Sequence, residues 1–192
     1  LTIPDAQQQG VGFGVSFQWD QPLLEGYRWR QANSQRGSGD LERAGGLWLS
    51  DPFRELRWAP AGLRPDAVLI TGWQCRGLLQ LLLAARLHRL PVLLRIESNN
   101  LSRRSWLARL WHRLLVHQAF ACLSIGSANT AFYRSLGVPP QRLISAPYFV
   151  DNSFFAERSS IARQQRHALR RRWTIPPECF CFLFAGKLQH KK

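Results

Sequence analysis

The 192-residue chain is 45% hydrophobic and 20% charged, so it can bury a core, and wholesale disorder is excluded. Its formal net charge is +14, concentrated in residues 97–192, which hold 15 Lys or Arg against four acids. A basic half indicates a polyanionic partner such as nucleic acid, anionic lipid or a phosphate-bearing substrate. Because 23 of the 26 basic residues are Arg, a compositional bias accounts for the bulk charge equally well.

The sequence contains no segment that we recognise as a membrane span or a leader sequence. The longest apolar run, Leu78–Ala85, is too short for a span, contains Gln80 and is followed by Arg86, and we recognise no signal peptide. The chain has no Met, and Lys192 falls where we expect a strand to pass into a loop. We therefore expect truncation at both ends.

The cysteines lie in apolar segments and have neither the spacing of a zinc site nor that of a disulfide framework. They are Cys75, Cys122, Cys179 and Cys181. We expect packed, reduced thiols in a cytoplasmic protein, and no metal site.

The first part of the chain predicts few regular elements. Gly10–Trp19 alternates loosely, as in a strand, and the Gly-rich segment 33–46 predicts a loop. A helix is expected to begin at Asp51–Pro52, with Asp51 as its N-cap and Pro52 in its first position.

From residue 66 onward, short apolar strands alternate with helices. The predicted strands are Asp66–Thr71, Pro91–Ile96, Ala119–Ile125 and Leu143–Tyr148, and the predicted helices are Cys75–His88, Arg103–His117 and Ser127–Leu136, the last capped by Ser127. Strands that are apolar on both faces and separated by helices predict an α/β fold, a Rossmann-like parallel sheet with helices on both faces.

The helix 103–117 is expected to be amphipathic. Its apolar stripe comprises Leu107, Leu110, Trp111 and Leu114. Trp106 falls off this stripe, near Arg109 and Arg113, and an exposed Trp flanked by Arg fits a membrane interface or a domain contact.

The character of the chain changes after residue 152. Ser159–Trp173 predicts a strongly basic helix that ends before Pro176–Pro177. Cys179–Ala185 then predicts a new buried strand, followed by Gly186–Lys187. This pattern indicates a linker and the opening of a second domain.

The carboxyl ends of parallel strands share one edge, where ligands of such sheets bind. Residues expected at this edge are Gly72, Trp73, Glu97, Ser98, Gly126, Ser127 and Tyr148. Gly72 and Gly126 are explained as well by chain turns, and Ser127 by helix capping. Glu97 is costly to bury unless it is paired or used, so a functional role and an ion pair with Arg95 stay open as alternatives.

Four segments in the same order resemble the family 4 glycosyltransferases. They are Gly14–Tyr27, Leu136–Arg142, Ala146–Asp151 and Phe182–Leu188. The last resembles the family's "flf.GrL...KG" motif, whose basic pair falls on Lys187 and Lys192.

The resemblance implies a retaining enzyme of the GT-B type, with a second domain related to the first. Residues 1–152 would form an acceptor-side Rossmann-like domain that lacks its first strand, 153–178 a linker helix and loop, and 179–192 the start of the donor nucleotide-sugar-binding domain. Such a fragment is expected to be inactive alone, and the resemblance implies no cofactor and no metal.

The resemblance also implies roles for particular residues. Lys187 and Lys192 would bind the donor diphosphate. Our hypothesis for the acceptor rests on the carboxyl edge of the sheet, where Tyr27, Trp73 and Ser127 are candidates for acceptor binding. Glu97 is the catalytic candidate, although many family members have His there, which leaves acceptor orientation as its alternative role.

The expected partners are a nucleotide-sugar donor, a glycan or lipid-linked acceptor, and an anionic membrane surface at the inner face of the membrane. The alternatives are a basic nucleic-acid-binding module or a non-catalytic peripheral membrane module. No nucleic-acid-binding motif accompanies the charge, so nucleic acid is not the partner we expect.

Overall fold

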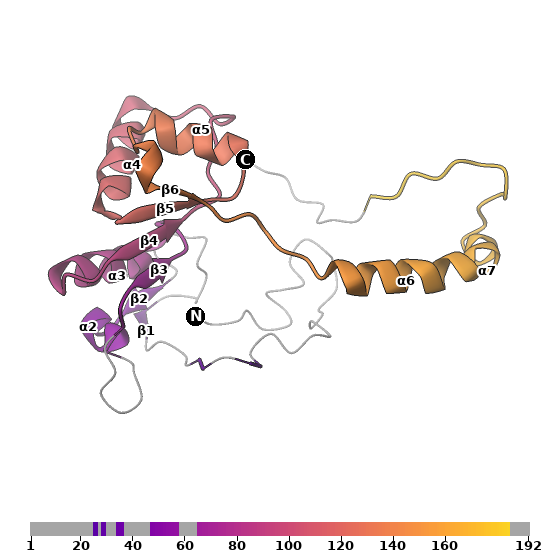
Figure 1. Ribbon diagram of the computed structural model, residues 1–192, viewed down its shortest axis with the longest axis horizontal. Coiled ribbons are helices and arrows are strands. Elements are labelled where there is room, and N and C mark those ends of the chain that lie inside the picture. Colours follow the sequence, from indigo (N-terminus) through magenta and orange to yellow (C-terminus); the bar gives the residue numbers. More distant parts are fainter. Residues whose placement is uncertain (1–24, 27, 30–33, 37–46, 58–64, 185–192) are drawn as a thin grey trace. The chain divides into compact units, whose positions relative to one another are not determined.

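The computed structural model describes residues 25–26, 28–29, 34–36, 47–57 and 65–184 (Figure 1). The described residues up to Pro147 belong to one compact unit, and those from Tyr148 onward belong to a second. The predicted strand at Gly10–Trp19 lies outside the described residues.

A four-stranded parallel sheet forms the centre of the first unit. Its order is β3-β4-β5-β6, and every neighbouring pair is parallel. The strands are β3 (Val68–Ile70), β4 (Val92–Arg95), β5 (Ala121–Ser124) and β6 (Leu143–Ser145), joined in turn by α3 (Arg76–Leu87), α4 (Trp106–Gln118), and α5 (Ser127–Ser135) with the short 3-10 helix η2 (Pro140–Arg142). The predicted Rossmann-like α/β fold is confirmed.

The sheet is buried more completely on one face than on the other. Ile70 pairs with Leu94, and Leu94 with Cys122, so these three side chains share the inner face and are almost completely buried. On the other face, Leu69 is 51% exposed and Ile144 is 47% exposed. The inner face therefore supplies most of the core among the described residues.

A two-stranded antiparallel ladder packs beside α3. It pairs β1 (Ser34–Arg36) with β2 (Trp48–Leu49), so the loop predicted over 33–46 is wrong at residues 34–36. Gln80 of α3 accepts a hydrogen bond from the Leu49 amide at 2.9 Å and donates one to the Leu49 carbonyl at 3.2 Å. This amide clamp explains why a polar residue interrupts the apolar run of α3, because two isolated backbone groups of β2 need partners.

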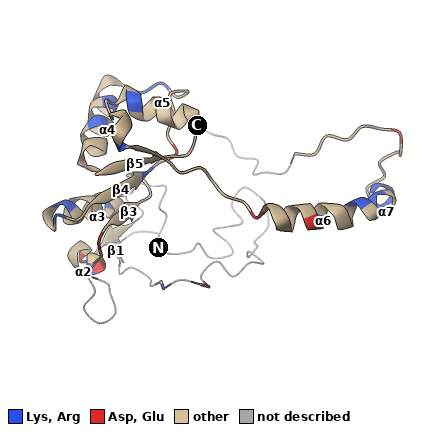
Figure 2. Cartoon of the chain, in the orientation of Figure 1, with Lys and Arg blue, Asp and Glu red and all other residues tan. Residues whose placement is uncertain are grey.

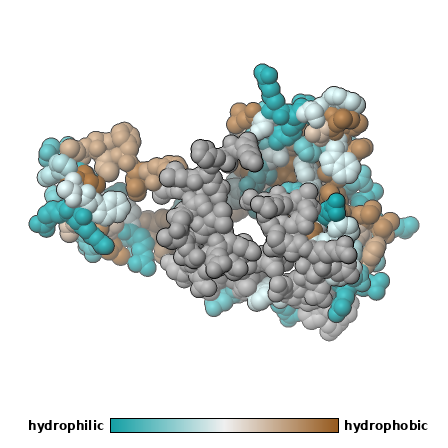
Figure 3. All heavy atoms as spheres, turned by 180° about the vertical axis from the view of Figure 1, so that it is seen from behind, coloured by the Kyte–Doolittle hydropathy of each residue, from teal (hydrophilic) through white to brown (hydrophobic). Residues whose placement is uncertain are grey.

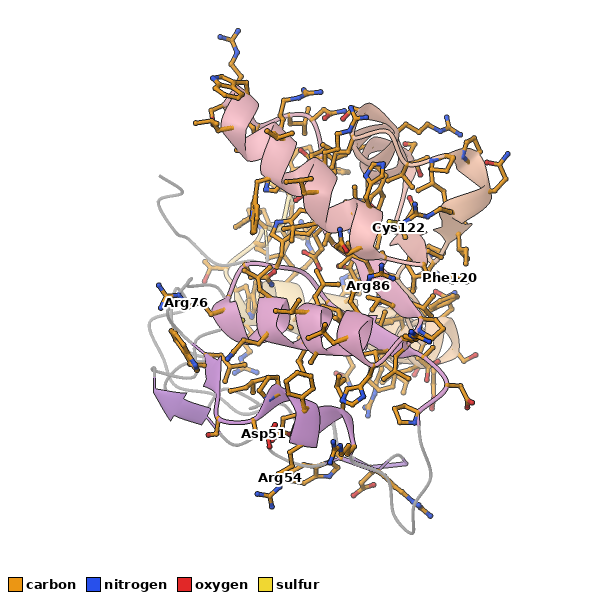
Figure 4. The ribbon with its side chains drawn as sticks, turned by 90° about the vertical axis from the view of Figure 1, so that its left-hand side faces the viewer. Asp51, Arg54, Arg76, Arg86, Phe120 and Cys122 are labelled. Carbon is orange, nitrogen blue, oxygen red and sulfur yellow. The ribbon has the colours of Figure 1, made fainter. Side chains whose placement is uncertain are left out.

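The short helix α2 (Pro52–Leu56) begins as the sequence predicts. The Asp51 carboxylate accepts a hydrogen bond from the Arg54 amide at 2.9 Å, and Pro52 occupies the first helical position. Figure 4 shows Asp51 and Arg54 at this helix, which packs against α3. The N-cap satisfies one of the free amides of the first turn.

A tyrosine hydroxyl secures α5 to the end of β4. Tyr133 is completely buried, and its hydroxyl donates to the Leu94 carbonyl and accepts from the Ile96 amide, each at 3.2 Å. Burial raises the pKa of the Tyr133 phenol above its ordinary range, which keeps the donating proton in place. One side chain thus satisfies two buried backbone groups.

The helix α4 is turned opposite to its predicted orientation. Its predicted core stripe is about half exposed throughout, at 58% for Leu107, 49% for Leu110 and Trp111 and 52% for Leu114. The buried residues are instead Leu115 and Val116. The helix carries apolar side chains on two opposite faces, so periodicity alone did not determine which face packs inward.

The second unit contains two consecutive helices, α6 (Asn152–Gln164) and α7 (Arg166–Arg172). The predicted basic helix begins earlier than expected, because Asp151 caps α6 by accepting from the Phe154 amide at 2.9 Å, and it is interrupted at Gln165. Neither helix has a buried residue.

The strand predicted at Cys179–Ala185 is not formed over its described residues, Cys179–Phe184. These residues are exposed, without regular structure, and pair with no strand in the described part of the chain. A β-strand acquires its backbone hydrogen bonds only from a neighbouring strand.

The four cysteines are free thiols of two kinds. Cys75 and Cys122 are buried, and burial raises the pKa of the Cys122 thiol to about 11, against a smaller opposite effect of Arg142. Cys179 and Cys181 are exposed, so the packing role expected for this pair is wrong in the described structure.

We expect Tyr133→Phe to lower the free energy of unfolding by about 1–3 kcal/mol, because it removes both hydrogen bonds between the buried hydroxyl and the backbone while preserving the ring. Urea unfolding followed by circular dichroism measures the change. Ser135→Ala, which removes an exposed residue's hydroxyl bond to the Phe132 carbonyl, is the control and should cost clearly less. Equal losses would contradict the role assigned to the Tyr133 hydroxyl.

Candidate functional site at the carboxyl edge of the sheet

Three helices begin at the edge where the parallel strands end. The N-cap positions are Cys75 for α3, Ser105 for α4 and Gly126 for α5. Of these three residues, only Ser105 caps its helix with a side chain, which accepts from the Ala108 amide at 3.3 Å. The Cys75 side chain makes no capping bond, and Gly126 has no side chain. The Gly77 amide of α3 already donates to the Leu47 carbonyl at 2.9 Å. The remaining first-turn amides and the helix dipoles make this edge favourable for negatively charged ligands.

The turn after β3 presents an aromatic side chain at this edge. Gly72 has a φ of 127°, a conformation that disfavours other residues, and it leads into the half-buried Trp73. The Trp73 ring stacks on His112 of α4, with ring centroids 4.9 Å apart and planes inclined by 25°. Trp73 is therefore held in place by α4, with part of its surface accessible.

His112 is the centre of a small ring cluster. Its other ring neighbour is Phe132 of α5, at a centroid distance of 6.2 Å, and the Arg104 guanidinium lies 4.8 Å from the Phe132 ring centroid. Burial, and secondarily the charge of Arg104, lowers the pKa of His112. The buried Nδ1 of His112 has no hydrogen-bond partner within the described ranges, which fits a neutral imidazole.

Glu97 lies two residues after the end of β4 and is exposed at the edge. Its carboxylate therefore has no desolvation cost that would require a partner or a function. Its neighbour Ser98 is fixed, because the buried Asn129 of α5 donates its amide to the Ser98 carbonyl at 2.7 Å. The same Asn129 accepts from the Ile125 amide at 3.2 Å, so one side chain joins the loops after β4 and β5.

The start of α5 differs in detail from the prediction. Ser127 is exposed and is the first helical residue, whereas Gly126 is the N-cap, so the predicted capping by Ser127 is wrong. The local hydrogen bonds come instead from Thr130, which donates to the Gly126 carbonyl at 3.0 Å, and from the buried Ser124, whose hydroxyl bonds to that of Thr130. The Ser127 hydroxyl thus lies on the surface of the edge.

The structure places three of the six predicted site residues. Trp73, Glu97 and Ser127 follow three neighbouring strands and lie along the same edge of the sheet. Tyr27, Lys187 and Lys192 lie outside the described residues. Asn129, His112 and Tyr133 were not predicted, because their partners are far away in the sequence.

An open cavity of about 750 Å³ lies at the opposite edge, near the start of the strands. Its wall includes Arg86 and Phe120, which Figure 4 labels, together with Arg89 and Arg142. The helices α3 and α4 end here, and their carboxyl ends disfavour anions. Arg142 already donates to the carbonyls of a neighbouring turn, so its charge is used structurally. This cavity is therefore a weaker candidate than the carboxyl edge.

Among the described residues, no group of three or more His, Cys, Asp or Glu could hold a metal ion. In the same part of the chain, no helix combines the length and apolar character that a membrane crossing requires.

A parallel sheet with helices that begin at its carboxyl edge defines an α/β protein of the Rossmann-like class, in which ligands bind at that edge. The sequence model of the glycosyl transferase 4-like domain matches residues 5–148. The chain therefore belongs to this glycosyltransferase family. No curated protein and no solved structure matches the chain significantly.

The lowered pKa of His112 predicts a pH-dependent stability. At a pH above the unfolded-state pKa of about 6.5, the His112 imidazole is neutral in both the folded and the unfolded protein. As the pH falls below this value, the imidazole is protonated first in the unfolded chain, because its pKa is lower in the folded protein. The folded state therefore loses stability. We expect His112→Phe, which preserves a ring against Trp73, to flatten the fall in unfolding free energy below about pH 6.5. Chemical denaturation across this pH range measures it.

His167→Gln removes an exposed imidazole of the second unit and is the control for losing one histidine. Parallel curves for wild type and His112→Phe would contradict the interpretation of a buried neutral imidazole.

Proposed function

We propose that the protein is a retaining GT-B glycosyltransferase that transfers a hexose from a nucleotide-sugar donor to a glycan or lipid-linked acceptor. The family match over residues 5–148 carries this proposal. The helix N-termini at the carboxyl edge support it, because nucleotide and sugar ligands bind at this edge in Rossmann-like sheets.

The proposed domain organisation assigns the two substrates to different parts of the chain. Residues 1–152 would bind the acceptor, 153–178 would link the domains, and 179–192 would open the donor domain. An isolated acceptor-side piece would then be inactive, since the nucleotide is held mainly by the donor domain. The reaction takes place in the cytoplasm, where nucleotide sugars are the donors for polysaccharide assembly.

The acceptor would bind along the carboxyl edge. Trp73 offers a ring face to a sugar, Ser127 offers an exposed hydroxyl, and Tyr27 is proposed to complete the surface. The stack on His112 supports Trp73 in this role, because a preorganised ring loses little freedom when the acceptor binds. The Asn129 bridge similarly restrains the loop that carries Glu97.

Glu97 is proposed to act on the acceptor hydroxyl. Exposure gives its carboxylate access to substrate, and the loop position brings it to the same edge as Trp73. A carboxylate there can accept the proton of the attacking hydroxyl or orient that hydroxyl by hydrogen bonding.

Lys187 and Lys192 are proposed to neutralise the donor diphosphate. The leaving nucleotide gains negative charge as the glycosidic bond to the sugar breaks, so cations at the diphosphate stabilise the transition state more than the bound substrate. These two positions rest on the resemblance of residues 182–192 to the family motif.

We expect Lys192→Ala in the full-length protein to weaken binding of the nucleotide-sugar donor by about 10-fold or more, because a hydrogen bond to a charged group is lost. Isothermal titration with a panel of uridine and guanosine diphosphate sugars measures this. Lys191→Ala removes the adjacent lysine and is the matched control. Unchanged affinity for Lys192→Ala, or equal losses in both variants, would contradict the diphosphate site.

We expect Glu97→Gln to lower kcat by about 100-fold or more with the donor KM unchanged, because the amide retains the shape but cannot take up a proton. Initial rates of nucleotide release with acceptor present measure it. Asp66→Asn, an exposed acid at the other end of the sheet, is the control. A rise confined to the acceptor KM would assign orientation rather than proton transfer to Glu97.

A further inference from the structure

The helix α4 carries two apolar stripes, although a surface helix of a soluble protein needs only one. Its inner stripe, Leu115 and Val116, is buried against the sheet. Its outer stripe remains exposed in the described structure, at 49–72% for every member. The outer stripe consists of Leu107, Leu110, Trp111 and Leu114. It also includes Trp106, which was expected to lie off the stripe but precedes Leu110 by four residues and so lies on the same side.

The members of the outer stripe recur at intervals of three and four residues, so they line one side of the helix. The helix has 13 residues and is therefore about 20 Å long. Two of its five outer side chains are Trp, whose rings prefer the boundary between water and lipid headgroups. Such a stripe on a helix that is too short to cross a membrane fits a helix lying in the plane of a bilayer surface.

Positive charges flank the outer stripe. Arg109 and Arg113, one turn apart, lie beside it, and Arg103 precedes the helix. All three are exposed, and no ion pair to any of them is formed within the described ranges. Figure 2 shows the blue of Lys and Arg on α3, α4 and α5.

Acidic residues are almost absent from this part of the sequence. Between Ala67 and Val150 there are ten Arg and no Lys, and the one acid is Glu97, at the carboxyl edge of the sheet. Within residues 67–150, the surface around α4 thus combines apolar and cationic side chains with a single carboxylate, which lies at the carboxyl edge. Figure 3 shows brown apolar and teal hydrophilic side chains next to each other on the surface of the first unit.

We propose that the outer stripe of α4 docks the protein on an anionic lipid surface. Trp106, Leu107 and Leu110 would enter the headgroup region, and Arg103, Arg109 and Arg113 would contact lipid phosphates. The inner stripe stays packed on the sheet, so docking requires no change of fold. The lipid source is a bilayer containing anionic phospholipid, recognised by charge together with an apolar interior.

A second copy of the chain is a less suitable occupant of the stripe. Two outer stripes packed face to face would bring the Arg rows of both copies together, and like charges repel most strongly where solvent is excluded. No acid on α4 offsets this repulsion. An anionic bilayer can bury the apolar side chains of the stripe and at the same time bind the flanking Arg side chains through lipid phosphates.

Cosedimentation with vesicles tests the proposal. The wild-type chain should bind vesicles of phosphatidylcholine mixed with phosphatidylglycerol, bind phosphatidylcholine alone much more weakly, and lose binding as salt is raised. The double variant Trp106→Gln/Leu110→Gln should reduce partitioning to the anionic vesicles by about 10-fold or more. Both positions are exposed, so the substitutions should leave circular dichroism and thermal unfolding unchanged.

Matched controls isolate the stripe from general charge and aromatic content. Trp173→Gln replaces a Trp of the second unit that is 58% exposed, and Arg134→Gln removes an exposed Arg of α5; both should bind vesicles as the wild type does. Arg109→Gln/Arg113→Gln should weaken binding to anionic vesicles selectively.

Three results would overturn the proposal: equal binding to both vesicle compositions, undiminished binding by a folded Trp106→Gln/Leu110→Gln variant, or no vesicle binding together with a concentration-dependent dimer that this variant abolishes. The docking surface deepens the proposed function, because a lipid-linked acceptor would be reached from it. The assay contains no sugar nucleotide, and donor titration contains no lipid, so the two proposals fail separately.

Discussion

The arrangement of the candidate site depends on how α5 is fixed to the end of β4. The Tyr133 hydroxyl bonds to the Leu94 carbonyl of that strand and to the Ile96 amide just beyond it, and Asn129 holds the following loop through the Ser98 carbonyl. Both side chains are buried, so each unmade bond would leave a desolvated polar group and cost free energy. The result is that Glu97, which itself is exposed, extends from a loop whose backbone is restrained on both sides of the carboxylate.

The direction of the strands then decides where charge can be accommodated. At the carboxyl edge, no side chain caps α3 or α5, although the Gly77 amide of α3 donates to the Leu47 carbonyl. At the opposite edge, the helix carboxyl ends are matched by Arg86, Arg89 and Arg142. The arginines therefore have different roles at different places. Some balance the carboxyl ends of helices, and others, such as Arg109 and Arg113, are exposed on α4.

The sequence predicted the sheet well and the site contacts poorly, for separate physical reasons. Apolar runs bounded by Gly or Pro identify buried parallel strands locally, and the shared edge follows from their common direction. The bonds of Asn129 and Tyr133 that fix α5 to the end of β4 and its following loop join residues 31 to 39 positions apart, so no local pattern could assign these roles. The orientation of α4 was missed because both of its faces are apolar, and Gly126 rather than Ser127 caps α5 because the polar bonds of that turn are made by Ser124 and Thr130.

The two faces of α4 connect the proposed chemistry with the proposed membrane contact. Its inner side contributes His112, which stacks on Trp73 at the carboxyl edge, while its outer side carries the stripe of Trp and Leu. The helix begins at that edge, since Ser105 is its N-cap, so a bilayer on the outer stripe would lie next to the loops that carry Trp73 and Glu97. An acceptor anchored in lipid could then present its sugar or phosphate end to the edge without leaving the membrane. Because one helix carries both surfaces, the distance between them is a fixed property of the fold, and exchanging exposed outer residues for Gln is expected to leave the inner ring cluster in place.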